Sequence, residues 1–303
     1  MDQLEAMAIL VASVETGSLT GAGRRLGAPL PTISRKITDL EAHLKTRLLI
    51  RTTRRLTLTD AGAAYIAAAR RILEQVDEAE RLAAGEYAAP RGDLVIAAPI
   101  VFGRLHILPI VSDFLARFDA INAHLLLSDR NMHLIDDHID VALRIGVLPD
   151  SSLVATRVGV VRSVVCASPA YLAAHGTPGT PGELADRDGV FFDALDAGGA
   201  WRFRAPGAAA DLIAPVRARL SVNTAEAAID AAIAGVGVAR VLSYQVAAAV
   251  ADGRLTIILR DFERAPLDVS LIHAGQGRLP LKTRAFLDMA APRLRQALTS
   301  LAA

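Results

Sequence analysis

The chain has 303 residues, of which 52% are hydrophobic and 21% are charged, and its formal net charge is +1. This composition describes a globular protein large enough for two or more domains and excludes a disordered chain. The single cysteine, Cys166, excludes a disulfide framework within the chain, and no uncharged run approaches the ~20 residues of a membrane-spanning helix. The N-terminus lacks the positive lead and cleavage site of a signal peptide, so we expect a cytoplasmic protein with no membrane partner.

The first residues, MDQLEAMAILVASVETG, predict an amphipathic helix. Residues three and four positions apart share a helix face. We therefore expect the apolar side of this helix to carry Leu4, Met7, Ala8 and Val11.

Residues 16–59 combine helix starts, a tight turn and clustered positive charge. Ser18 is a good N-cap for a short helix, and Gly27 and Pro29 end that helix. Pro31 then stands in the first turn of a second helix, where a proline is tolerated. This order of elements indicates a helix-turn-helix.

The second helix has an apolar face and a polar face. Apolar side chains recur at steps of three and four residues, at Ile33, Ile37, Leu40 and Leu44. The other face carries Thr32, Ser34, Arg35 and Lys36. An arginine can bond guanine through two hydrogen bonds, and short hydroxyls bond base edges or phosphate, so this face has the chemistry of a major-groove reader.

A basic hairpin follows the second helix. Residues 48–51 and 56–59 predict two short strands around a turn of threonines and arginines, which together form a wing. Between residues 20 and 60, nine cationic side chains face three carboxylates, a net charge of +6 that leaves about −5 for the rest of the chain. Positive charge is therefore concentrated where DNA phosphates would lie.

These features resemble the DNA-binding domain of the LysR-type transcriptional regulators. The matching words are MDQLEAMAILVASVETGSLTGAGRRLG and PTISRKITDLEAHLKTRLLIRTTRRLTLTDAG, in order and without gaps. Many members have a Ser-Gln pair before the proline, where this chain has Pro29-Leu30, so we expect its operator to differ from the commoner ones. The resemblance implies contacts with a double-stranded DNA operator through Ser18, Thr20, Pro31, Thr32, Ser34, Arg35, Lys36, Arg51, Thr52, Thr53, Arg54 and Arg55.

Residues 60–85 predict a long helix that begins at Asp60 and ends at Gly85. The resemblance implies that this linker helix pairs with its copy in a homodimer, that dimers form a homotetramer and that RNA polymerase is a further partner. Packing of the helix on its own chain is the alternative. The apolar residues spread along it are Ala64, Ile66, Ala69, Ile72, Leu73, Val76, Ala79 and Leu82.

After a hinge at residues 88–92, strand patterns alternate with helix patterns. This alternation favours open, mostly parallel α/β sheets. The strands are predicted over residues 94–100, 124–129, 141–146, 153–160, 163–168, 216–222, 255–259 and 268–274. The helices are predicted over residues 103–118, 169–175, 224–234, 243–250 and 280–301.

Three domains are therefore expected. Residues 1–59 form an all-α winged helix-turn-helix, residues 60–89 the linker helix and hinge, and residues 90–303 an α/β effector domain. By the resemblance, the effector domain has two Rossmann-like lobes, similar to periplasmic binding proteins. Lobe I is expected over residues 90–161 and 267–303, and lobe II over residues 162–266.

Ligands of open α/β sheets bind at the carboxyl ends of strands, and two such corners stand out, at residues 98–103 and 221–224. In the family that the chain resembles, these corners line a cleft between lobes that binds a small-molecule effector. Many relatives have Ser or Thr where this chain has Val101, so we expect an aromatic or otherwise apolar effector, with Arg144 as counter-ion for a carboxylate. A structural ion pair for Arg144 is the alternative. The candidate effector-binding residues are Ile100, Val101, Phe102, Arg144, Ile145, Asn223 and Thr224.

Other motifs predict little chemistry. The cluster His133, Asp136, Asp137, His138 and Asp140 lacks the HExxH or paired CxxC patterns of zinc sites. Gly235-Val236-Gly237 lacks the third glycine of a dinucleotide loop and more simply permits a close helix-to-strand turn, and Cys166 lies in an apolar strand. We expect no enzyme activity and no cofactor. The alternative function is an α/β enzyme or small-molecule-binding module with a helical appendage that does not read DNA.

Overall fold

The structure is a computed structural model, and it describes residues 2–51, 56–83, 89–130, 132, 134, 137–148, 153–196, 199–274 and 279–302. The contacts within the chain divide it into two compact units, Met1–Ala89 and Pro90–Ala303. No helix among the described residues is long and apolar enough to cross a lipid bilayer.

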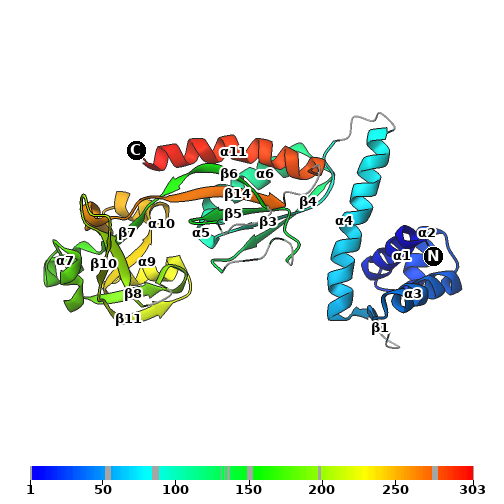
Figure 1. The fold of residues 1–303 in the computed structure, drawn as a ribbon, viewed down its shortest axis with the longest axis horizontal. Helices are drawn as coiled ribbons and strands as arrows, with labels where there is room; N and C mark the ends of the chain where they lie inside the picture. The colour runs from blue at the N-terminus through cyan, green and yellow to red at the C-terminus, as the bar shows by residue number, and fades with distance from the viewer. Residues whose placement is uncertain are drawn as a thin grey trace. The chain divides into compact units, whose positions relative to one another are not determined.

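The N-terminal unit is a winged helix-turn-helix followed by a long helix (Figure 1). Its elements are α1 (Gln3–Glu15), α2 (Leu19–Leu26), α3 (Leu30–Leu44), β1 (Leu49–Arg51), β2 (Leu56–Leu58) and α4 (Asp60–Ala83). Ser18 caps α2 by accepting a hydrogen bond from the Gly21 N–H at 2.9 Å, and Gly27 ends α2 in the left-handed conformation with φ 65°. α3 has Pro31 in its first turn, as predicted.

The helices of this unit meet in one apolar core. α3 buries Ile33, Ile37 and Leu40, and Leu44 is partly buried against them, which confirms the predicted apolar face. The predicted face of α1 is wrong, because Leu4 is exposed and the buried residues are Ala6, Ile9, Leu10, Ala12 and Ser13. Every residue from 6 to 14 is apolar or small, so periodicity does not single out one face, and contacts with α2, α3 and α4 decide it.

α4 is anchored to its own unit over its first turns. The Thr59 hydroxyl caps it by accepting a hydrogen bond from the Gly62 N–H at 2.9 Å. Ile66 and Ala69 are buried, and α4 packs along α1. Further along, Ile72 is 38% exposed, whereas Val76 is half-buried. The predicted end at Gly85 lies outside the described residues.

Lobe I of the C-terminal unit is a five-stranded sheet in the order β4-β3-β5-β14-β6, covered by helices (Figure 1). Its elements are β3 (Gly92–Ala98), α5 (Ile100–Phe102), the π-turn η1 (Gly103–Ile107), α6 (Leu108–Arg117), β4 (Ile121–Leu127), β5 (Val141–Ile145), β6 (Leu153–Val161), β14 (Leu267–Ala274) and α11 (Leu281–Ala302). α11 and α6 pack together, with the rings of Phe114 and Phe286 5.5 Å apart between centroids.

Lobe II is a second five-stranded sheet in the order β11-β8-β12-β7-β13, with a separate pair of strands, β10-β9. Its strands are β7 (Ser163–Ala167), β8 (Asp188–Phe192), β9 (Trp201–Arg204), β10 (Asp211–Ala214), β11 (Arg217–Val222), β12 (Val238–Leu242) and β13 (Thr256–Ile258). Its helices are α7 (Pro169–His175), η2 (Pro181–Asp186), α8 (Asp193–Asp196), α9 (Ala225–Ile233), α10 (Ser243–Ala251) and η3 (Arg260–Phe262). The strands β8, β9, β10 and β12 were not predicted.

Both sheets are mixed, which corrects the expectation of mostly parallel sheets. β3 pairs parallel with β4 and β5, whereas β14 pairs antiparallel with β5 and β6. Likewise β8 pairs parallel with β11 and β12, and β7 pairs antiparallel with β12 and β13. The antiparallel pairs involve the strands next to the lobe crossings: β6 leads into β7, and β13 into β14. A strand that arrives from the other lobe has no crossover helix before it, so parallel pairing is not imposed.

Two glycines allow β12 to follow α9 through a tight turn and to lie close to β8. Gly235 has φ 79° at the end of α9. A Cβ at Gly237 would lie 2.2 Å from the carbonyl oxygen of Asp188, so only a glycine lets the start of β12 approach β8. The pair therefore serves a close helix-to-strand turn, as predicted.

Candidate functional site

The polar side of α3 is open to solvent. Arg35 is exposed, and its guanidinium has no hydrogen bond or ion pair with the described residues. Thr32 and Ser34 are half-buried beside it. Lys36 differs, because its ammonium group forms an ion pair with Glu5 of α1 and its side chain is only 20% exposed. Of the two cations, Arg35 is therefore the one available to a partner.

The turn before α3 is also accessible. Thr20 and Pro31 are exposed, whereas the Ser18 hydroxyl is engaged as the cap of α2. These residues lie at the N-terminal ends of α2 and α3, where backbone N–H groups favour anions such as phosphate.

The wing is tied to α3 through one carboxylate. Glu41 Oε1 accepts hydrogen bonds from the backbone N–H groups of Leu48, at 2.8 Å, and Leu49, at 3.0 Å. α4 passes close behind, because a Cβ at Gly62 would lie 2.0 Å from the carbonyl oxygen of Leu48. β1 and β2 then pair antiparallel, as predicted. The predicted contacts Thr52, Thr53, Arg54 and Arg55, and the side chain of Arg51, lie outside the described residues.

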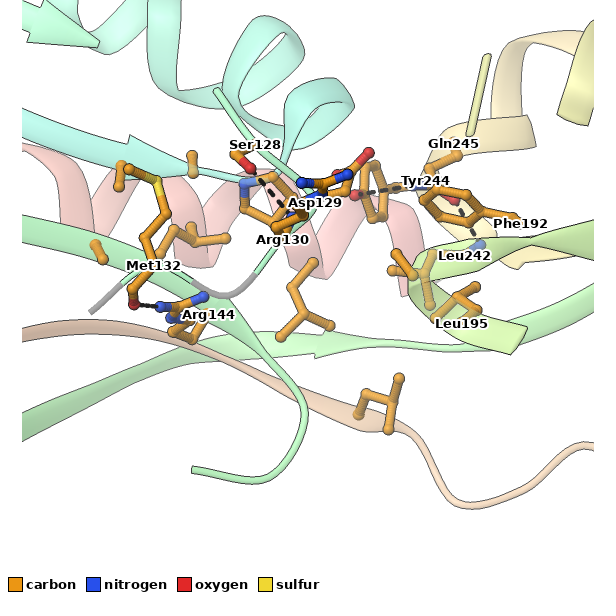
Figure 2. A pocket seen from close by; sticks show the side chains of 18 residues that line it. Ser128, Asp129, Arg130, Met132, Arg144, Phe192, Leu195, Leu242, Tyr244 and Gln245 are labelled. Carbon is orange, nitrogen blue, oxygen red and sulfur yellow. Dashed lines mark hydrogen bonds between the residues drawn. The ribbon is translucent and has the colours of Figure 1, made fainter. Parts of the chain in front are cut away.

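The C-terminal unit holds a cavity of about 200 Å³ lined by residues of both lobes (Figure 2). Lobe I contributes residues at the carboxyl ends of β3, β4 and β5, and lobe II contributes the ends of β8 and β12 with residues of α8 and α10. Figure 2 shows Asp129 and Arg130 between Arg144 on one side and Tyr244 on the other. Polar side chains thus converge where open sheets usually bind ligands.

Asp129 is the carboxylate of this cavity. Its Oδ1 accepts a hydrogen bond from the backbone N–H of Ile100 at 3.1 Å. Its Oδ2 is buried and has no hydrogen-bond partner in the described part of the chain. Burial raises the pKa of Asp129, the Ile100 N–H opposes that rise, and the charge of Glu226 adds to it. The corner N–H at Ile100 is therefore already occupied by an anion of the protein itself.

The opposite wall is an aromatic and amide pair. The Tyr244 hydroxyl accepts a hydrogen bond from Gln245 Nε2 at 3.3 Å, and Gln245 Oε1 accepts one from the Leu242 N–H at 2.8 Å. Burial, with the charge of Asp129, raises the pKa of Tyr244, so this hydroxyl stays neutral. The Tyr244 ring packs edge-on against Phe102, with centroids 5.2 Å apart.

Two arginines add positive charge to the cavity. Arg130 is exposed, and its guanidinium has no partner among the residues that the structure describes. Arg144 is half-buried and donates a hydrogen bond to the carbonyl of Met132. Burial lowers the pKa of Arg144, and the Asp137 carboxylate opposes this shift. The cavity therefore presents one carboxylate and two guanidinium groups.

Comparison with known families covers both units. Residues 4–63 match the bacterial regulatory helix-turn-helix protein of the lysR family, and residues 88–295 match the LysR substrate binding domain. The chain is a LysR-type transcriptional regulator. Its helix-turn-helix unit and its effector-binding unit are those of this family.

Relatives of the regulator include a repressor and activators. It is 33% identical over 288 residues to an HTH-type transcriptional repressor of Pseudomonas aeruginosa, covering 95% of this chain and 91% of that one. It is 28% identical to the HTH-type transcriptional activator AaeR of Escherichia coli, over 95% and 93% of the two chains. The solved structure of CrgA from Neisseria meningitidis is similar with a TM-score of 0.61 and 29% identity, over 96% and 98% of the chains. The Vibrio cholerae virulence activator AphB gives a TM-score of 0.60 and 27% identity, over 95% and 98%.

The structure corrects part of the predicted effector set of the regulator. Arg144 and Ile145 line the cavity. Val101 and Phe102 do not, because both are buried in the core of the C-terminal unit, so they do not make the cavity apolar. Ile100 contributes through its backbone N–H, to Asp129.

The second predicted corner is also not part of the cavity. Thr224 caps α9 by accepting a hydrogen bond from the Ala227 N–H at 3.4 Å, which is the capping role that such residues commonly have. Asn223 is exposed. Both follow β11, whereas the strands of lobe II whose ends reach the cavity are β8 and β12.

Sequence reasoning missed Asp129, Arg130, Tyr244 and Gln245. Asp129 ends the stretch HLLLSD, which was predicted as a strand, and Tyr244 begins a predicted helix. The rule that ligand groups follow strand ends applies to these positions too, and polar residues there were the available signal.

Asp140 and Cys166 belong to the remaining sequence motifs. Asp140 accepts a hydrogen bond from the Val95 N–H at 2.9 Å, His133 and Asp136 lie outside the described residues, and no metal-binding group of side chains occurs among the described ones. Cys166 is buried, and burial raises the pKa of its thiol to about 12. A thiol with that pKa stays protonated and is a poor nucleophile.

Proposed function

We propose that α3 reads the bases of a double-stranded DNA operator and that the wing contacts its phosphates. The observation that supports this most is the exposed guanidinium of Arg35 on the polar face of α3, which has no partner among the described residues. Thr20, Pro31, Thr32 and Ser34 lie near it and supply further contacts. Lys36 acts through its ion pair with Glu5, which holds α3 against α1.

The test is binding of the full-length protein to the DNA upstream of its own gene, compared with scrambled DNA over a salt series. We expect selective binding that weakens by about ten- to a hundredfold in Arg35→Ala, because one bidentate base contact contributes ~1–3 kcal/mol. Equal binding of both DNAs by the wild-type protein, or unchanged selectivity in Arg35→Ala, would contradict the reading role of α3.

We propose that α4 forms a homodimer with its copy, and that dimers assemble further into a tetramer. Ile72 is 38% exposed on α4 in the single chain, and Leu73 and Val76 are half-buried near it, so this stretch has apolar surface left to cover. Ile72→Asp should shift the protein toward monomers in sedimentation velocity. Ala63→Asp, at an exposed position on the opposite side of the same helix, is the control.

We propose that the effector occupies the cavity around Asp129 and is a small carboxylate that also carries a hydrogen-bond donor or an ammonium group. Arg130 and Arg144 supply positive charge for the carboxylate. Oδ2 of Asp129 is buried and has no hydrogen-bond partner in the described part of the chain, so a ligand group placed there has to be a donor, and a carboxylate there would be repelled. An aromatic part would find Tyr244 and Phe192 at the opposite wall.

A thermal-shift screen of the full-length protein tests this class. Small amino acids are compared with the matching simple carboxylates and amines. We expect stabilisation by compounds that carry both groups, and its loss in Asp129→Asn and Arg130→Ala. Stabilisation by simple carboxylates that persists in Asp129→Asn would mean that Asp129 does not select the ligand.

We propose that the cavity binds its ligand without transforming it and that the protein acts in the cytoplasm, together with RNA polymerase. Turnover of a stabilising compound by the protein, followed by chromatography, would contradict the first of these proposals.

A further inference from the structure

A second cavity, of about 330 Å³, lies in the C-terminal unit next to the first. Leu195 and Leu267 line both cavities, so the two cavities are adjacent. Four arginines line the second cavity: Arg202 and Arg204 of β9, Arg240 of β12, and Arg264 of the segment that returns the chain to lobe I. We call this cavity the arginine pocket.

The sequence of β9 explains why two of these arginines face the same way. Side chains alternate across a strand, so Trp201 and Phe203 enter the core of lobe II while Arg202 and Arg204 share the other face. Arg240 interrupts the apolar strand β12 in the same manner. Arg202, Arg204 and Arg240 thus line one side of the pocket, and the segment that returns to lobe I lines another.

The carboxylates around the pocket balance only part of this charge. Arg240 forms a buried ion pair with Asp196, at 2.7 Å, and also donates a hydrogen bond to the carbonyl of Leu195 at 2.6 Å. Arg204 and Arg264 share a single carboxylate, Asp211, each at 3.0 Å. Glu263 at the rim has its own partner, Arg162, at 3.4 Å.

Arg202 has no such partner. It is exposed, and no described residue forms a hydrogen bond or ion pair with its guanidinium. The four lining arginines face the carboxylates Asp196 and Asp211, and the lining Glu263 is matched by Arg162, so these five arginines and three carboxylates leave a net charge of +2. A concave site with unbalanced guanidinium groups attracts anions, and guanidinium donates paired hydrogen bonds to carboxylate and phosphate oxygens.

We propose that the arginine pocket is a second ligand site, which binds a small oxyanion, either a carboxylate or a phosphate, through Arg202 and Arg264. Arg204 adds charge, and Arg240 is committed to Asp196 and lines the pocket. Because Arg264 belongs to the return segment and Arg202 to β9, a bound anion links the hairpin of lobe II to the connection between lobes. A bound anion would alter the wall of the first cavity through Leu195 and Leu267, which line both cavities.

The chain carries its own reporter of this site. Trp201 is the only tryptophan of the sequence, is fully buried, and lies beneath the Arg240 guanidinium, 5.7 Å from ring centroid to Cζ. Charge brought to the neighbouring arginines alters the field at the indole. Phosphate bound by the arginines of the DNA-binding unit does not reach this reporter by direct contact, since the reporter is packed within lobe II.

The experiment follows Trp201 emission of the full-length protein while sodium phosphate or sodium succinate is added, with sodium chloride at equal ionic strength as the reference. We expect a saturable change with at least one of the two oxyanions and none with chloride. The oxyanion that saturates at the lower concentration identifies the ligand chemistry as phosphate or carboxylate. No DNA is present, and Arg130→Ala, which removes a guanidinium of the first cavity, should leave this response unchanged, so the result is separable from the proposed function.

Arg202→Ala and Arg264→Ala should each raise the half-saturating concentration by about tenfold or more, since a charge-assisted hydrogen bond contributes ~1.5–3 kcal/mol. Arg254→Ala is the control, because Arg254 is an exposed residue of lobe II that pairs with Asp252 away from the pocket. Thermal melts establish that all three variants fold. A change that is linear in concentration, that chloride reproduces, or that persists unchanged in Arg202→Ala would overturn the proposal.

Discussion

Asp129 accepts a hydrogen bond from the backbone N–H of Ile100 at 3.1 Å, and this contact joins the end of β4 to the corner after β3. It places an anion of the protein at the corner where the sequence suggested an anionic ligand. The contact has consequences for stability as well as for ligand choice, because the carboxylate is partly buried and its second oxygen is unpaired within the described structure.

Asp129→Asn should raise the melting temperature at neutral pH. The Asn side chain keeps an oxygen for the Ile100 N–H and carries no charge to desolvate. Burial raises the pKa of Asp129 in the folded state, so folding is favoured most below the unfolded pKa and this contribution is lost as pH rises through the folded pKa. The difference in melting temperature between variant and wild type should therefore be largest at pH 7–8 and should become smaller toward pH ~4. A melting-temperature difference that increases on acidification would contradict a raised pKa of Asp129.

Lys36→Ala and Arg35→Ala should differ in how much operator affinity and selectivity they remove. Arg35→Ala should reduce operator affinity and selectivity while leaving stability within about 0.5 kcal/mol, because its side chain is exposed. Lys36→Ala should reduce affinity by less, since its ammonium is held by Glu5. Fluorescence anisotropy with operator and scrambled DNA measures both. Equal losses of selectivity in the two variants would show that Lys36 also reads bases.

Glu41→Ala should loosen the wing. It removes the acceptor of two backbone N–H groups at the start of the wing, with an expected loss of about 1–3 kcal/mol in the free energy of unfolding. The slope of DNA affinity against salt should also become shallower, because a displaced wing makes fewer phosphate contacts. Asp39→Ala, an exposed acid on the same helix, removes the same charge without these bonds and should leave both quantities nearly unchanged.

Gly237→Ala should destabilise the protein by about 1–3 kcal/mol, because its Cβ would lie 2.2 Å from a backbone oxygen that cannot move aside cheaply. Gly179→Ala is the matched control. Its Cβ would meet nothing closer than Glu183 Oε1, at 3.6 Å, so it should be neutral or gain up to ~1 kcal/mol. Urea unfolding followed by Trp201 emission compares them, and equal effects would disprove the close-approach argument.

Arg240→Ala should cost about 3–5 kcal/mol, because it leaves the buried carboxylate of Asp196 without its partner. Arg217→Ala breaks an exposed pair with Asp188, which Arg219 also contacts at 2.5 Å, and should cost less than about 1 kcal/mol. Chemical denaturation of both variants measures the difference. Similar costs would indicate that burial does not set the strength of these pairs.

Local signals in the chain were enough to predict the elements that depend on neighbouring residues. The cap at Ser18, the break at Gly27 and Pro29, and the apolar spacing from Ile33 to Leu40 identified α2 and α3, because helix starts and faces depend on neighbouring residues. Long strands and helices of the C-terminal unit were predicted for the same reason. The resemblance to the family was inferred from the order of the matching sequence segments.

Packing between elements that are distant in the chain determines which side chains meet. Val101 and Phe102 were candidates for a ligand site, yet the continuous helical segment after β3 turns them into the core, and Asp129, 29 residues beyond Ile100, takes the corner N–H instead. α1 is apolar on several sides, so only its neighbours select the buried one. The arginine pocket joins β9, β12 and the return segment, which are distant in the chain. Local patterns specify elements, whereas sites arise where packing brings separate elements together.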